Sequence, residues 1–185
     1  MRPRRIFRPA PSPRRWGTFA VGALAALGAV TIAVAIPGDL FGSAPRDQLW
    51  AAGPGEVRVL DGDTLRLGDR VLRLAALDVP DRGRASCRDA AGRLADCAGL
   101  AAESLAGLIA GRGVECRVQG RDRMGRGFGS CRAGGVELNA SQIAAGWALA
   151  ESGSALVPVE AAARQARRGL WAPEATPPES WRGRR

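Results

Sequence analysis

Three short clusters of carboxylates and arginines are the residues best suited to chemistry. The first is Asp61–Thr64, the second joins Arg73 to the run Asp78–Asp81, and the third is Asp122–Arg126. Carboxylate oxygens are the ligands that calcium prefers, and a pair of arginines can hold a phosphate and stabilise the charge that develops on it. Taken singly, Asp-Gly is a common turn, and an arginine beside a carboxylate is usually a weak surface ion pair. Their meaning therefore depends on their order and spacing along the chain.

The residue types that are missing narrow the chemistry further. The 185-residue chain has no histidine, lysine or tyrosine, and its 27 basic residues, all arginine, exceed its 18 acidic ones to give a net charge of +9. Without imidazole or amine groups, the chain cannot build Ser-His-Asp or Cys-His sites, a Schiff base, a P-loop or a histidine-containing zinc site. Any catalysis must therefore use carboxylates, arginines, hydroxyls, thiols or backbone groups.

Alternating apolar residues predict the strands that position these clusters. Strands over 57–60, 65–67 and 71–77 would carry the first two clusters, and a hairpin with strands at 114–118 and 128–132 would carry the third in its turn. Apolar spacing of three and four predicts helices over 98–111, 138–145 and 156–168. This order predicts a small closed or nearly closed β-barrel with helical cover.

The ordered set of motifs over residues 56–171 resembles the staphylococcal nuclease (thermonuclease) family. The matching pieces are DGDTLRLGDRVLRLAALDVPD, DRMGR, Leu138-Asn139, Gly146-Trp147-Ala148, and Glu160, Arg164 and Gly169-Leu170-Trp171. The resemblance implies a mainly β fold of the α+β class, a five-stranded OB-type barrel with about three helices. It also implies a calcium-dependent phosphodiesterase that cleaves DNA and RNA.

The resemblance also assigns the metal site. Asp63 and Asp78 match the family's carboxylate ligands, and the backbone carbonyl of Val79 matches a further ligand. Asp61 and Thr64 are expected to support the loop and the direct ligands from behind. These oxygens are the hard donors that calcium requires.

The remaining family positions carry the catalytic groups. Arg73 and Arg126 match the two phosphate-clamping arginines, and Asp81 matches the carboxylate that activates the attacking water. The family has Glu at the position of Asp81 and commonly Tyr at that of Met124, and residues 149–158 lack the family's aromatics. These departures predict a weak or shifted nuclease. They also keep open a catalytically degraded module that binds nucleic acid or a protein partner.

A long uncharged segment precedes the body of the chain. The stretch 16–36 carries no charged residue and is long enough, at about 1.5 Å per residue, to cross roughly 30 Å of hydrocarbon. Six arginines precede it, so an uncleaved anchor would leave the N-terminus in the cytoplasm and the body outside. A buried core helix is the plainer alternative, and a cleavage site at 42–44 keeps secretion open.

The four cysteines agree with an exported domain. Cys116 and Cys131 are symmetric about the Arg123–Met124 bond and would face each other across the hairpin, and Cys87 and Cys97 lie within one loop. The sequence therefore predicts the disulfides Cys87–Cys97 and Cys116–Cys131, with four inert buried thiols as the alternative.

These predictions divide the chain into five parts and describe a monomer with a DNA or RNA substrate. The parts are a basic cytoplasmic tail (1–15), a membrane anchor or uncleaved signal (16–36), a linker (37–54), the thermonuclease-like domain (55–172) and a Pro/Arg-rich tail (173–185).

Overall fold

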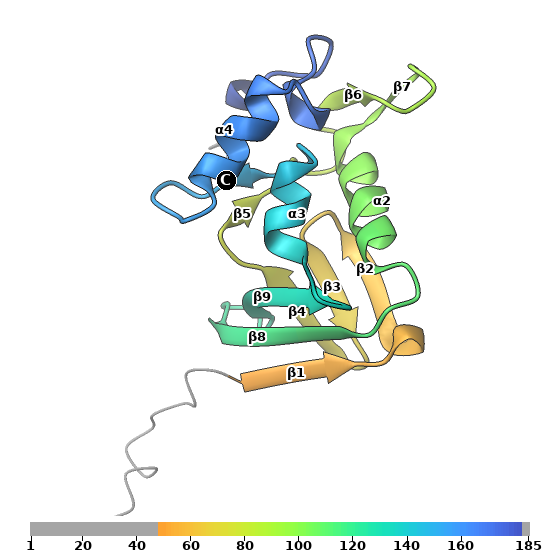
Figure 1. Cartoon of the computed structure of the whole chain (residues 1–185), viewed down its shortest axis with the longest axis vertical. Coiled ribbons are helices and arrows are strands. Elements are labelled where there is room, and N and C mark those ends of the chain that lie inside the picture. The colour runs from red at the N-terminus through yellow and green to blue at the C-terminus, as the bar shows by residue number, and fades with distance from the viewer. Residues whose placement is uncertain (1–47, 183–185) are drawn as a thin grey trace, which may run out of the picture. The chain divides into compact units, whose positions relative to one another are not determined.

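The computed structural model describes residues 48–182, which form a mainly β structure with three helices (Figure 1). The predicted membrane segment 16–36 lies outside these residues. Within 48–182, no helix has the length and apolar character needed to cross a bilayer.

The main sheet has seven strands and curls into a half-barrel, which is consistent with an OB-like fold (Figure 1). Its hydrogen-bonded order is β1-β8-β9-β4-β3-β2, with β10 paired to β9, and only β4 and β9 run parallel. Five of its strands are the predicted ones: β2 (Val57–Asp61), β3 (Thr64–Leu67), β4 (Arg70–Leu74), β8 (Val114–Arg121) and β9 (Gly127–Ala133). The strands β1 (Gln48–Ala52) and β10 (Val136–Glu137) are additional to the five that were expected.

Strand β1 occupies part of the stretch predicted as a linker and adds an edge to the sheet. It pairs with β8 and carries the buried Trp50. The guanidinium groups of Arg70 and Arg121 pack on the Trp50 ring, 5.3 and 5.0 Å from its centroid. A Cβ on Gly127 would lie 2.8 Å from this ring, so only glycine fits there. The hydrophobic core therefore extends to residues that the sequence pattern does not mark.

The helices cover the sheet at the side that carries the first two clusters (Figure 1). They are α2 (Cys97–Ile109), α3 (Leu138–Ala144) and α4 (Val157–Gln165), close to the three predicted ranges. The carboxylate of Asp96 caps α2 by accepting from the amide of Ala98. The buried amide of Gln142 on α3 donates to the carbonyls of Gly62 and Ala101, which ties α3 to α2 and to the turn after β2.

The predicted strand 71–77 is broken into two strands, which is a correction to the sequence reading. Strand β4 ends at Leu74, and Ala76 takes a positive φ of 62° before β5 (Leu77–Asp78) begins. The break is held because the Ala75 amide donates to Gly129 and the Ala75 carbonyl accepts from Asn139. Strand β5 then pairs with β11 (Leu149–Ala150) instead of the main sheet.

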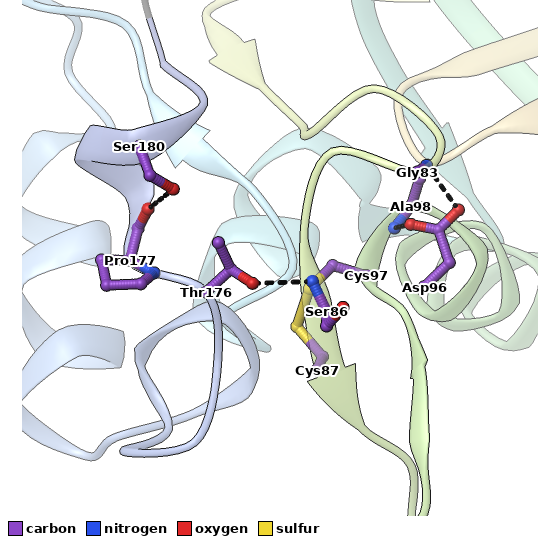
Figure 2. Close-up of a disulfide and its surroundings, with 9 residues drawn as sticks. All are labelled: Gly83, Ser86, Cys87, Asp96, Cys97, Ala98, Thr176, Pro177 and Ser180. Carbon is purple, nitrogen blue, oxygen red and sulfur yellow. Dashed lines mark hydrogen bonds between the residues drawn. A yellow bond between two sulfur atoms is a disulfide. The ribbon is translucent and has the colours of Figure 1, made fainter.

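A second hydrophobic cluster joins a small hairpin to the C-terminal segment. The hairpin strands β6 (Ser86–Arg88) and β7 (Leu94–Asp96) are closed by the disulfide Cys87–Cys97. Figure 2 shows Thr176 beside this disulfide, with its hydroxyl accepting from the Ser86 amide. Residues 173–182, part of the predicted Pro/Arg-rich tail, pack against the domain and bury Trp181. Residues 48–182 also contain three short 3-10 turns: η2 (Pro54–Glu56), η3 (Gly169–Trp171) and η4 (Pro178–Ser180).

Both cystine bridges have the predicted pairing. Cys87 is bonded to Cys97, and Cys116 is bonded to Cys131 across the β8–β9 hairpin, where the two residues are register partners. Both pairs are buried.

Candidate active site

Most of the predicted site residues line one cavity of about 310 Å³, which we call the site pocket. Its lining contains three carboxylates and two arginines, from segments far apart in the chain. It is formed by Asp61, Asp63, Thr64, Arg73, Val79, Pro80, Asp81 and Arg126. A larger cavity of about 620 Å³ lies at the end of β1 and β8, but it contains none of the predicted site residues. The site pocket, and not the larger cavity, is therefore the candidate active site.

Arg73 bridges the two carboxylates that were predicted to bind metal. Its Nε donates to Oδ2 of Asp63 at 2.6 Å, and its Nη2 donates to Oδ1 of Asp78 at 3.4 Å. The other oxygen of Asp63 accepts from the Thr64 hydroxyl at 2.7 Å, so this buried carboxylate is held on both sides. Asp78 does not line the site pocket but forms an ion pair with Arg73, which does.

The electrostatics of Arg73 keep it charged. Burial alone lowers its pKa, but the charge and hydrogen bond of Asp63, together with the charges of Asp78 and Glu151, raise the pKa above its usual value. The guanidinium is thus a fixed positive charge at the pocket at any ordinary pH.

The turn between β2 and β3 positions Asp63. The amide of Leu74 donates to the Asp63 carbonyl at 2.7 Å, and the Gly62 carbonyl accepts from Gln142. A Cβ on Gly62 would lie 2.5 Å from the Cβ of Ala101 on α2. The glycine of the Asp-Gly-Asp motif is therefore required by helix α2, which presses directly on the turn.

The segment after β5 brings Val79 and Asp81 to the pocket. The pairing of Asp78 with Leu149 fixes its start. At its far end, the amide of Gly83 donates to the carboxylate of Asp96, the residue that caps α2 (Figure 2). The two anchors hold Asp81 in a short connection between β5 and the disulfide-closed hairpin.

The turn between β8 and β9 positions Arg126. Oδ1 of Asp122 accepts from the amides of Met124 and Arg126, each at 2.9 Å, and its Oδ2 accepts from Nε of Arg126 at 2.7 Å. Partial desolvation raises the pKa of Asp122, but the hydrogen bonds from Arg126 and Met124 outweigh it and lower the pKa below its usual value. Gly125 supplies the positive φ, 78°, that closes the turn.

Phe128 is a candidate functional residue that the sequence reasoning missed. It is 38% exposed and is the register partner of Arg73 across β4 and β9. With Arg73, Gln119 and Asp122 it lines a third cavity, of about 320 Å³. The signal was present in the sequence, because buried Gly127 and Gly129 flank Phe128 and the period of two turns its ring outward.

The donor set fits a hard cation. Asp63 and Asp78 offer carboxylates and Val79 offers a carbonyl, and all are oxygen ligands. Oδ1 of Asp61 is buried and has no hydrogen-bond partner, its nearest cationic contact being Nε of Arg82 at 3.8 Å. In residues 48–182, no three acidic or cysteine side chains cluster closely enough to bind a metal by themselves. Water and phosphate oxygens would have to supply the remaining ligands.

Comparison with known proteins places the chain among proteins named as endonucleases. No family model matches the sequence. Over 104 residues it is 36% identical to the succinoglycan biosynthesis protein ExoI of Rhizobium meliloti, a match that covers 55% of this chain and about half of that protein. Over 139 residues it is 32% identical to proteins named uncharacterized endonuclease from Escherichia coli O157:H7 and from Escherichia coli, covering 70% of this chain and 84% of each of them. The chain therefore belongs to the same family as these two endonuclease-named proteins.

Proposed function

We propose that the chain is a nuclease that hydrolyses the phosphodiester bonds of DNA or RNA, of the staphylococcal nuclease type and dependent on calcium. The observation that carries the proposal is the site pocket. Arg73 from β4 and Arg126 from the β8–β9 turn line it together with Asp63 and Asp81. The names of the two Escherichia coli relatives support the same reaction class.

The two arginines and three of the carboxylates in and beside the site pocket each have a role in this proposed reaction. Arg73 and Arg126 would bind the non-bridging oxygens of the scissile phosphate and stabilise the extra negative charge of the transition state. Asp81 would accept a proton from the attacking water, whose oxygen forms a bond to phosphorus as the bond to the leaving oxygen breaks. Asp63, Asp78 and the Val79 carbonyl would hold calcium, which when bound supplies further positive charge to the phosphate.

Phe128 supports a nucleic-acid substrate. Its exposed ring lies next to Arg73, so a nucleotide whose phosphate binds Arg73 could place its base on the ring. Stacking of a base on an aromatic side chain is worth about 1–3 kcal/mol. Phe128 would partly take over base stacking from the aromatic side chains that the thermonuclease family has in this part of the chain and that are absent from segment 149–158.

We further propose that the domain acts outside the cytoplasm, anchored through residues 16–36 or secreted if that segment is cleaved. Two buried disulfides support this location, because such bonds form and persist in oxidising compartments.

The alternative is a module of the same fold that binds nucleic acid without cleaving it. Asp81 favours it, since the carboxylate is one methylene shorter than the family's glutamate and misplacement of a catalytic group can cost about a hundredfold in rate.

Cleavage of single-stranded DNA by the full chain, with and without calcium, tests the proposal. Wild type should cleave only with calcium, and Asp63→Asn should lose cleavage and calcium binding together. Arg126→Ala should lose turnover but keep calcium binding by titration calorimetry. Asp69→Asn is the matched control, because this carboxylate is 92% exposed and lies outside the site pocket. A folded wild type that cleaves nothing at saturating calcium would contradict the nuclease and leave the binding module.

A further inference from the structure

We propose that the outer face of β2 and β3 binds the phosphate backbone of the same polynucleotide strand that is cleaved in the site pocket. The surface, which we call the arginine row, consists of Arg58, Arg66 and Arg126. The inference rests on the proposed function and extends it, because it makes the protein a binder of long single strands and not only of the scissile phosphate.

The strand register places the arginine row beside the site pocket. Arg58 on β2 is the direct partner of Arg66 on β3, and Arg66 is the partner of Val71 on β4. Arg66 is exposed between buried Leu65 and Leu67, so it points away from the core.

The row continues from β4 to the third cluster. The parallel pair of Leu72 and Gly127 puts Arg126, one residue earlier, next to Val71. Thr64 and Arg73, which line the site pocket, lie two residues from Arg66 and Val71 on the same face of their strands. With strands about 4.8 Å apart, the row crosses the sheet outward from the pocket.

Two members of the row, Arg58 and Arg66, form no ion pair in residues 48–182, whereas Arg126 pairs with Asp122. Like charges directly opposite one another on a sheet are unfavourable. Arg58 nevertheless faces Arg66 and donates only to the carbonyls of Gly55 and Val57, each at 2.9 Å. In the described part of the chain, Arg66 has no ion pair or hydrogen bond.

Some of the exposed arginines elsewhere on the domain are neutralised by carboxylates. Four of them form ion pairs with a carboxylate nearby in space: Arg70 with Asp69, Arg93 with Asp89, Arg132 with Glu137 and Arg164 with Glu179. Arg58 and Arg66, which no carboxylate neutralises, lie beside the pocket proposed to bind phosphate, so their charges complement a polyanion. A strand whose scissile phosphate lies between Arg73 and Arg126 would carry its next phosphates over Arg66 and Arg58.

The salt dependence of binding tests the row. The probe is a fluorescent oligothymidylate of about 15 nucleotides, bound to the full chain without calcium so that it stays intact, and followed by anisotropy. Each phosphate contact to a single strand contributes about −0.7 to the slope of log K against log salt, so Arg58→Gln/Arg66→Gln should lower the slope by about 1.4. Between 50 and 200 mM salt, wild type should therefore lose about sevenfold more affinity than this variant.

The matched control is Arg88→Gln/Arg168→Gln. It removes the same charge from two exposed arginines that donate to backbone carbonyls, as Arg58 does, and that lie away from the row. Its slope should equal that of wild type. Three results would contradict binding by the arginine row. They are an unchanged slope in the row variant, an equal fall of the slope in the control, and no binding of the oligonucleotide by wild type.

Cleavage of a dinucleotide by wild type with calcium separates this inference from the proposed function. Two nucleotides fill the site pocket but do not extend over Arg58 and Arg66. If wild type cleaves neither the dinucleotide nor single-stranded DNA, the nuclease is contradicted. If it cleaves them and the slope of the row variant is unchanged, only the binding role of Arg58 and Arg66 is contradicted.

Discussion

Arg73 stands where two negative charges would otherwise repel each other. It is 28% exposed and contacts Asp63 at 2.6 Å and Asp78 at 3.4 Å. Removing it would leave the buried carboxylate of Asp63 without its charged partner, which is costly in a partly desolvated site. Arg73 therefore serves stability in addition to the phosphate binding that we propose for it, and a substitution here cannot separate the two roles.

Asp81→Glu is the most informative single change in the site pocket. It lengthens the carboxylate by one methylene and restores the side chain that the thermonuclease family has at the water-activating position. If position is the only defect, the rate of cleavage should rise, by up to about a hundredfold. Measured kcat/KM on single-stranded DNA should increase while calcium affinity stays constant. An equal or lower rate of cleavage would show that the length of the Asp81 side chain does not limit activity.

Asp122 links the stability of the Arg126 turn to pH. Its pKa is lowered in the folded state, so its stabilising contribution is present above the unfolded pKa and is lost as pH falls through the folded pKa. Asp122→Asn should therefore be less stable than wild type at neutral pH, with the difference shrinking between about pH 5 and pH 3. Urea unfolding across this range measures it, with Asp69→Asn as the control. A difference that is constant with pH would argue against the link.

Among the elements, those with strong local signals were predictable. Period-two alternation indicated β2, β3, β8 and β9, and the order of turns indicated where Asp63 and Arg126 would lie. The break at Ala76 was not predictable, because it depends on hydrogen bonds to Gly129 and Asn139 that are distant in sequence.

Two further elements lack a local signal for a different reason. Strand β1 owes its place to the burial of Trp50 against Arg70 of β4 and Arg121 of β8, a contact that can form only once these two strands are in place. The strands of hairpin β6–β7 have only three residues each, too few to show a hydrophobic pattern, and the Cys87–Cys97 disulfide holds the hairpin closed. The position of Phe128 beside Arg73 depends on the long-range pairing of β4 with β9, which no local pattern indicates.

The two disulfides should have different structural consequences when removed. Cys87→Ala/Cys97→Ala opens a ten-residue loop and should cost about 2–4 kcal/mol of unfolding free energy. It should also release the C-terminal segment, because Thr176 and Ser86 are hydrogen-bonded beside this bridge. Hydrogen exchange at the amides of Ser86 and Thr176 should become faster.

The matched control is Cys116→Ala/Cys131→Ala, which opens a loop of similar length within the main sheet. It should lose comparable stability but leave the exchange of those two amides unchanged. If exchange at these two amides became equally faster in both variants, it would depend only on the global stability of the domain and not on the Cys87–Cys97 bridge.

At the scale of the whole molecule, topology in the membrane remains a prediction. If residues 16–36 span the bilayer behind six arginines, a reporter that is active only in an oxidising compartment should be active when fused after Arg185. Deleting 16–36 should abolish that activity. Reporter activity in the cytoplasm from the intact fusion would contradict the topology.

The parallel pairing of β4 with β9 has a consequence for the order in which the protein folds. Strands β2, β3 and β4 form one local meander, and β8 and β9 form a local hairpin closed by its own disulfide. Arg73 belongs to the first unit and Arg126 to the second, and only the long-range β4–β9 contact brings them together. Such non-local contacts carry the largest loop-closure entropy and form slowly. A chain that has folded either unit alone has only one of the two arginines proposed to bind phosphate. We therefore expect phosphate binding and the β4–β9 pairing to appear in the same kinetic step.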